Sequence, residues 1–146
     1  MEKISFDSGI KEYRINGAGV LRFNPADPNV YARFLEATEK IQAVEDELSQ
    51  QAKALAGEDS GAQAVMLLAQ ADQKMKQLLS WVFGEQNSFE KILQGVNLLA
   101  VAGNGERVIT NLLEALQPVL IAGAELCASQ TAQAAVDKAR ARREKK

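Results

Sequence analysis

The sequence contains no histidine and only one cysteine among its 146 residues. Histidine is the commonest general base and metal ligand near neutral pH, so the usual catalytic triads and histidine-bearing zinc sites are excluded within one chain. A single cysteine, Cys127, allows no internal disulfide and suits a reducing compartment. The composition therefore favours a protein that is not an enzyme, and we expect neither a metal nor another cofactor.

Long apolar runs are also missing. The longest uncharged run, residues 92–105, is broken by glycines and is shorter than the roughly 20 apolar residues that cross a bilayer. The first nine residues, MEKISFDSG, contain no apolar stretch of the kind found in a signal peptide. We therefore expect a cytoplasmic protein with no membrane partner.

Charge is unevenly distributed although the net charge is only −2. The last ten residues, DKARARREKK, have a net charge of +4, and the preceding 136 residues have a net charge of −6. The basic end could contact phosphates or an acidic protein through Lys138, Arg140, Arg142 and Arg143. No aromatic residue is interleaved with these side chains, so the alternative of a solubilising end is favoured over nucleic-acid binding.

The first 24 residues carry the β signals of the chain. Apolar and polar residues alternate in EYRI and in VLRFN, and the NGAG between them predicts a hairpin turn. Residues 3–6, KISF, could add a third strand through a turn at FDSG. A two-stranded sheet is marginal in water, so we expect it to lie against a helix or another subunit.

The rest of the chain has the periodicity of helices. Asp27 and Pro28 predict a helix start, and the apolar stripe that follows extends to about Ala56. A second helix is expected from Asp59 or Ser60 to Phe83, and a short one from a cap at Asn87 or Ser88 to Gly95. A last helix should begin near Glu106, and Pro118 should kink or interrupt it.

These elements predict an α+β fold that is predominantly α, with an N-terminal antiparallel hairpin or meander, four or five helices and a long C-terminal helix. Residues 1–123 would form one globular domain, with a β-hairpin region at 1–24 and a helical region at 28–123. Residues 124–146 would be an exposed helical or partly disordered basic tail. Among the methionines, Met75 falls in the apolar stripe of the second helix, whereas Met66 faces elsewhere.

The stretch LSWVFGEQNSFEKILQG, residues 79–95, concentrates aromatic side chains at a helix end. Such residues most often close a helical corner, but tryptophan is also enriched where protein surfaces meet. The two interpretations remain open at this stage. If the stretch is a contact surface for a client or a second subunit, its contact residues would be Trp81, Phe83, Phe89 and Ile92.

Two segments resemble a family of small proteins encoded in phages and prophages of Gram-positive bacteria. RFNPADPNVYARFLEA is similar to that family's strand-to-helix segment, and LLSWVFGEQNSFEKILQGVNLL is similar to its aromatic helix end, F-G-E turn and short helix. The resemblance covers about residues 12–36 and 78–116. It implies a tail assembly chaperone that coats the tape measure protein, self-associates and works in the bacterial host cytoplasm.

The resemblance does not extend to residues 124–146, so it assigns no role to the basic end. Two alternatives to the chaperone remain. One is a structural virion or adaptor protein of the tail or head–tail region, whose hairpin adds a strand to a neighbour. The other is a small nucleic-acid-associated regulator that uses the basic end.

Overall fold

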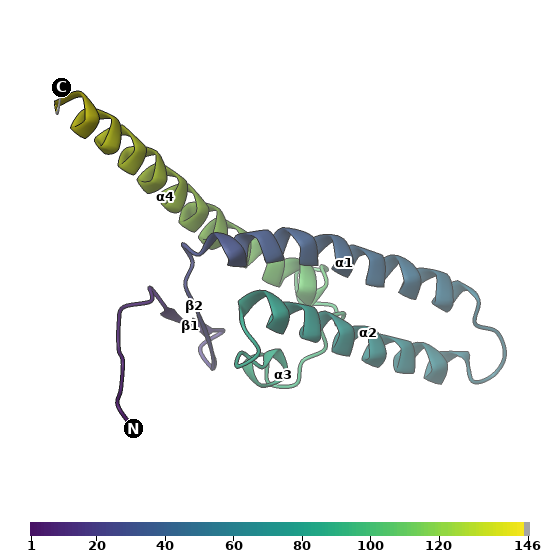
Figure 1. Cartoon of the computed structure of the whole chain (residues 1–146). Helices are drawn as coiled ribbons and strands as arrows, with labels where there is room; N and C mark the ends of the chain where they lie inside the picture. Colours follow the sequence, from purple (N-terminus) through teal and green to yellow (C-terminus); the bar gives the residue numbers. More distant parts are fainter. Residues whose placement is uncertain (145–146) are drawn as a thin grey trace.

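The computed structural model describes residues 1–144 as a two-stranded antiparallel hairpin followed by four helices (Figure 1). The strands are β1, Lys11–Ile15, and β2, Gly19–Phe23. The helices are α1, Pro28–Lys53; α2, Ser60–Phe83; α3, Phe89–Ile92; and α4, Val108–Glu144. The predicted α+β, predominantly α fold class with a long C-terminal helix is confirmed.

The hairpin turns at NGAG, as the sequence predicts. Asn16 and Gly17 have φ values of 50° and 74°, a conformation that asparagine and glycine tolerate well. The expected strand at residues 3–6 does not form, because the described sheet contains only β1 and β2. The side-chain amide of Asn24 donates to the Ser8 carbonyl at 3.0 Å. This bond holds the start of the chain beside the end of β2, away from the free edge of β1.

Local capping determines where α1 and α3 begin. The Asp27 carboxylate accepts a hydrogen bond from the Asn29 N–H at 2.9 Å, and Pro28 occupies the first helical position. The Ser88 hydroxyl accepts from the Lys91 N–H in the same way at the start of α3. The helix ends agree less well with expectation: α1 stops at Lys53 rather than Ala56, and α3 stops at Ile92 rather than Gly95.

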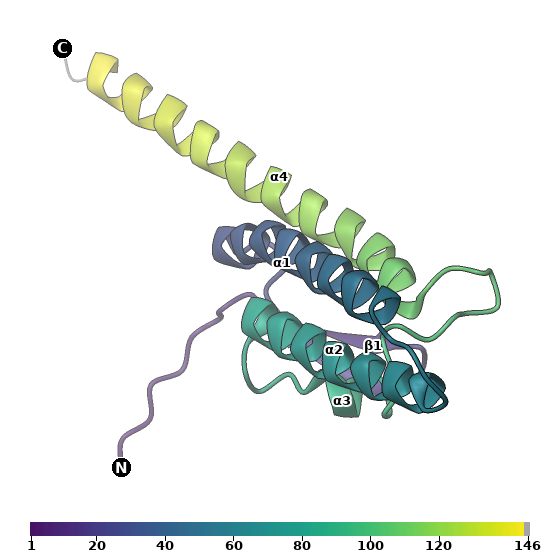
Figure 2. The same cartoon turned by 90° about the vertical axis from the view of Figure 1, so that its right-hand side faces the viewer.

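The helices α1 and α2 form an antiparallel pair, with α4 crossing α1 and the hairpin below (Figures 1 and 2). In the segment from α3 to Leu99, α3 packs against α2 and β2, and the Leu98 carbonyl accepts a hydrogen bond from the Ile109 N–H at the start of α4 at 2.8 Å. The largest fully buried side chains come from the hairpin, α2, α4 and the segment from α3 to Leu99, and are Phe89, Leu21, Met75, Leu79, Leu98, Ile109, Leu120 and Val82. Met75 is fully buried and Met66 is 61% exposed, which confirms the predicted contrast between them.

The helix α4 runs without a break through Pro118, so of the two expected effects, a kink or an interruption, the interruption is wrong. Pro118 and Glu114 both lie on the exposed side of the helix. The Glu114 carbonyl, which loses its usual N–H donor at Pro118, can therefore be hydrated. The helix also continues past residue 123, although Gly123 is its last buried residue. The next 21 residues extend about 32 Å at 1.5 Å per residue, and Figure 1 shows them projecting from the body.

The position of Gly123 is determined by a close approach to the chain between β2 and α1. A Cβ atom at this glycine would lie 1.7 Å from the Pro25 carbonyl oxygen, which is backbone and cannot rotate away. We therefore expect Gly123→Ala to lower the free energy of unfolding by about 1–3 kcal/mol, the usual cost of overpacking. Helix propensity alone predicts the opposite sign, because alanine is favoured over glycine within helices.

Chemical denaturation of Gly123→Ala beside Gly61→Ala measures which effect prevails. Gly61 lies in α2, and a Cβ atom added there would meet nothing within 4 Å, so alanine at this position should be neutral or stabilising. A stabilised Gly123→Ala protein would show that α4 does not pack against Pro25 in solution.

Candidate protein-interaction surfaces

The four aromatic-stretch residues expected at a contact surface divide into one exposed and three buried side chains. Phe83, Phe89 and Ile92 are 4%, 1% and 6% exposed, and Trp81 is 37% exposed. The three buried residues therefore belong to the core, which corrects their assignment to a contact surface. The reason is that α3 folds back over the end of α2, so the apolar edge of this short helix meets β2. Trp81 alone remains accessible, with the Lys40 ammonium 5.0 Å from its ring centroid.

Four aromatic rings, of which only that of Tyr13 is not fully buried, form one continuous row from β1 to α3. The ring centroids of Tyr13 and Phe23 are 5.1 Å apart, those of Phe23 and Phe83 are 4.7 Å apart, and those of Phe83 and Phe89 are 5.8 Å apart. Aromatic pairs at these distances contribute to stability beyond their buried area. The aromatic stretch thus joins the helical corner to the hairpin.

Asn87 fastens the same corner to β2. Its side-chain oxygen accepts from the Arg22 N–H at 2.9 Å, and its side-chain nitrogen donates to the Arg22 carbonyl at 2.8 Å and to the Phe83 carbonyl at 2.9 Å. The amide therefore occupies the place that a third strand would take on the outer edge of β2. In the sequence Asn87 is only a candidate helix cap, because its partner Arg22 is 65 residues away.

The two segments that carry the family resemblance meet in space. β2 and the start of α1 belong to the first segment, and the α2–α3 corner belongs to the second. Besides the Asn87 bonds, the Arg33 side chain donates through Nε to the Val82 carbonyl at 3.0 Å. The two segments therefore form one packing unit.

A buried ion pair holds α2 to the segment that follows it. The Lys76 ammonium lies 2.8 Å from Asp72 Oδ2 and 2.6 Å from Glu90 Oε2, and the Asp72 and Lys76 side chains are 8% and 6% exposed. The second oxygen of Asp72 accepts from the Leu98 N–H at 2.8 Å. Sequence periodicity did not reveal this cluster. Its one signal was a pair of opposite charges four residues apart on the buried side of a helix.

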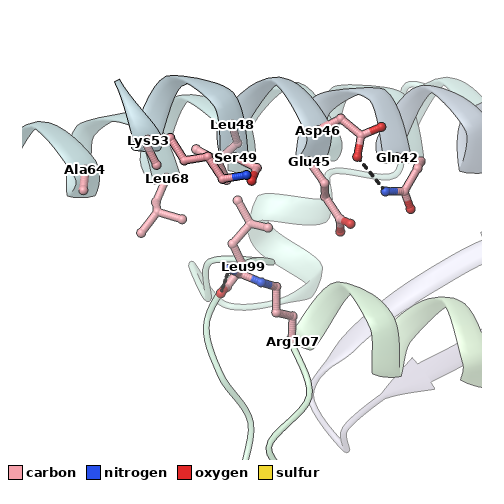
Figure 3. A pocket seen from close by; sticks show the side chains of 11 residues that line it. Gln42, Glu45, Asp46, Leu48, Ser49, Lys53, Ala64, Leu68, Leu99 and Arg107 are labelled. Atoms are coloured by element: carbon pink, nitrogen blue, oxygen red, sulfur yellow. Dashed lines mark hydrogen bonds between the residues drawn. The ribbon is translucent and has the colours of Figure 1, made fainter. Parts of the chain in front are cut away.

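A cavity of about 660 Å³ lies between the C-terminal half of α1, the start of α2, and residues Leu99 and Arg107 (Figure 3). The Arg107 guanidinium donates to the Leu99 carbonyl at 2.7 Å, and Gln42 donates to Asp46 at 3.0 Å. Neither of these two interactions pairs a nucleophile with a base.

The helix α2 presents an uncharged ridge to solvent. Met66 and Trp81 are separated by 15 positions, which is about 22 Å along the helix and about 60° around it. Three exposed glutamines lie between them on the same side of the helix, at Gln70, Gln73 and Gln77. We call these five residues the α2 ridge.

The basic side chains of the C-terminal end lie on the exposed, projecting part of α4. Lys138, Arg140, Arg142 and Arg143 are separated successively by about 200°, 200° and 100° around the helix. They therefore spread over about 200° of the helix circumference instead of forming one narrow basic face. Lys145 and Lys146 lie outside the described residues.

Within residues 1–144, no three His, Cys, Asp or Glu side chains are grouped so that they could hold a metal ion. Over the same residues, α4 is the one helix long and apolar enough to cross a membrane, judged by length and composition. Helices of water-soluble proteins also meet this criterion, so it carries no argument for a membrane partner.

A scan against protein-family models, a search of curated proteins and a search of solved structures each find no match to this chain.

Proposed function

We propose that this chain is a non-enzymatic phage tail assembly chaperone-like protein that binds the tape measure protein during tail morphogenesis in the bacterial cytoplasm. The observation that carries the proposal is the meeting of the two family-like segments in one packing unit around Asn87. Two short segments that resemble one family and pack against each other support a fold shared with that family more strongly than two segments that lie apart. The absence of histidine from the sequence also favours a binding role over catalysis.

The α2 ridge is the surface that suits a long helical client. Methionine adapts to varied apolar partners, tryptophan is enriched at the centre of interfaces, and glutamine can both donate and accept hydrogen bonds. The five side chains of the ridge are themselves uncharged, and the Lys40 ammonium lies 5.0 Å from the ring centroid of Trp81 at one end of it. The length of the ridge, about 22 Å, corresponds to about four turns of a client helix.

Co-expression with a helical fragment of the tape measure protein tests the proposal. We expect the two chains to co-purify, and we expect Trp81→Ala to weaken binding by about tenfold or more, as removal of an interface tryptophan commonly does. Val65→Ala is the matched control, because Val65 is 64% exposed on the same helix but lies about 160° around it from Trp81. Thermal unfolding of each variant verifies that it is folded.

Failure of the intact chain to bind any part of the tape measure protein would contradict the proposal. Equal losses from Trp81→Ala and Val65→Ala would contradict the assignment to the α2 ridge. Mass spectrometry of finished particles separates the chaperone from a structural virion protein, because an assembly chaperone should be absent from them.

A further inference from the structure

β1 has an open edge that could accept another strand. In the hairpin register Glu12 lies opposite Arg22, whose backbone N–H and carbonyl point away from β1 to Asn87. Residue pairs in an antiparallel ladder alternate between hydrogen-bonded and non-hydrogen-bonded pairs. The backbone N–H and carbonyl groups of Glu12 and Arg14 therefore point away from β2, out of the free edge of β1. Among residues 1–144 no hydrogen bond reaches these outward groups. One edge of the hairpin is thus closed by Asn87 and the other is free.

An apolar groove runs along that free edge. A cavity of about 490 Å³ lies between β1 and α4, lined from the strand by Tyr13 and Ile15 and from the helix by Ala115, Leu116 and Val119. Tyr13 and Ile15 are only half-buried, whereas Leu21 and Phe23 on the same face of β2 are 0% and 3% exposed. The apolar face of the sheet is therefore fully covered at β2 and only partly covered at β1.

The first residues of the chain have the pattern that fits this groove. Ile4 and Phe6 are 91% and 81% exposed, and they alternate with Lys3, Ser5 and Asp7. In an extended strand Ile4 and Phe6 would share one face, and the polar residues would share the other. If such a strand lay beside β1 with Ile4 and Phe6 on the same face of the sheet as Tyr13 and Ile15, these two side chains would face α4. The polar residues would then lie beside Glu12 and Arg14 on the solvent face.

We propose that the N-terminal arm, residues 1–7, of one copy adds as a third strand to β1 of a second copy and fills the groove between β1 and α4. The added strand would form hydrogen bonds with the open backbone edge of β1 and bury Ile4 and Phe6. Both gains would stabilise the sheet, because a two-stranded sheet is only marginally stable by itself. This proposal concerns self-association and is independent of the tape measure protein.

Contacts at the base of the arm favour a second copy over the chain's own β1. Asn24 binds the Ser8 carbonyl at 3.0 Å, and the Asp7 carboxylate accepts from the Gly9 N–H at 2.8 Å. Gly9 has a φ of 76°, and Figures 1 and 2 show the arm leading away from the body beyond this point. Seven extended residues span about 23 Å, which is enough to reach a neighbouring molecule.

Two single changes test the contact from its two sides, with oligomeric state measured by light scattering and sedimentation. Ser5→Pro removes a strand N–H from the arm, and Ala115→Arg places a charged side chain at the exposed wall of the groove. Each should weaken self-association at least about tenfold. The matched controls are Ser5→Ala in the arm and Ala128→Arg on the projecting, exposed part of α4. Both controls should associate like the unchanged protein.

A mixing experiment then distinguishes exchange between copies from folding back within one chain. A chain lacking residues 2–7 retains its groove, and the Ala115→Arg chain retains its arm. Each alone should be monomeric, and the mixture should form a heterodimer in which the amides of Glu12 and Arg14 in the arm-less chain become protected from hydrogen exchange.

Three results would overturn the proposal. They are a full-length protein that stays monomeric at every concentration tested, association that survives removal of the arm, and protection of the Glu12 and Arg14 amides that is independent of protein concentration. The last result would place the arm on its own β1.

Discussion

Lys76→Ala should lower the free energy of unfolding by about 3–5 kcal/mol, the usual cost of removing one partner from a buried ion pair. The substitution leaves the Asp72 carboxylate buried with the Leu98 N–H as its one remaining partner in the described structure. The helix α2 would also lose its link to Glu90 at the start of α3. Since small domains are stable by about 5–15 kcal/mol in total, this change should remove a large share. Urea denaturation followed by circular dichroism measures it.

Two further variants separate the buried charge from the loss of packing. Glu90 is 53% exposed, so Glu90→Ala should cost much less than Lys76→Ala. The double variant Asp72→Asn with Lys76→Met keeps an oxygen for the Leu98 N–H and leaves no unpaired buried charge, since the Glu90 side chain is 53% exposed. It should therefore recover much of the stability lost in Lys76→Ala. A double variant as unstable as the single one would show that an uncompensated charge is not the cause.

Phe89→Ala should also lower the free energy of unfolding by about 3–5 kcal/mol, because it leaves a large cavity where the ring was. Phe89 is 1% exposed, and its ring ends the aromatic row that passes through Phe83 and Phe23 to β1. Loss of the ring should loosen α3 from β2 as well as destabilise the whole chain. Denaturation measures the effect on stability, and hydrogen exchange at the Arg22 amide reports the loosening.

Phe6→Ala is the matched control, since it removes the same ring from a position that is 81% exposed. At a concentration where the protein is monomeric it should leave the free energy of unfolding unchanged within about 0.5 kcal/mol. Equal effects of the two substitutions would mean that the corner around Phe89 is not part of the core in solution.

Much of the helical architecture could be predicted from the sequence because its signals are local. Asp27 and Pro28 mark the start of α1, Gly84 ends α2, and Ser88 caps α3, each through groups only a few residues apart. The opposite exposures of Met66 and Met75 likewise follow from helical spacing along one element. Pro118 shows the limit of such rules, because its effect depends on whether the freed carbonyl can reach water.

The contact residues were harder to predict because spacing cannot show which neighbour covers an apolar side chain. Trp81, Phe83 and Phe89 lie close together along the chain, yet α3 and β2 cover two of them and leave the tryptophan accessible. Asn87 and Lys76 gave weak signals for the same reason. Their partners include Arg22 across 65 positions and Glu90 across 14.

The sequence by itself determined the order and type of the elements, the hairpin turn at Asn16–Gly17 and the concentration of positive charge at the C-terminal end. Those properties depend on backbone preferences, caps and composition, which act within a few residues. Only the tertiary structure decided that Asn87 closes one edge of the hairpin, that β1 leaves the other edge open, and that α4 loses its cover after Gly123. These outcomes depend on which distant segments meet, because hydrogen bonds and burial are settled between neighbours in space.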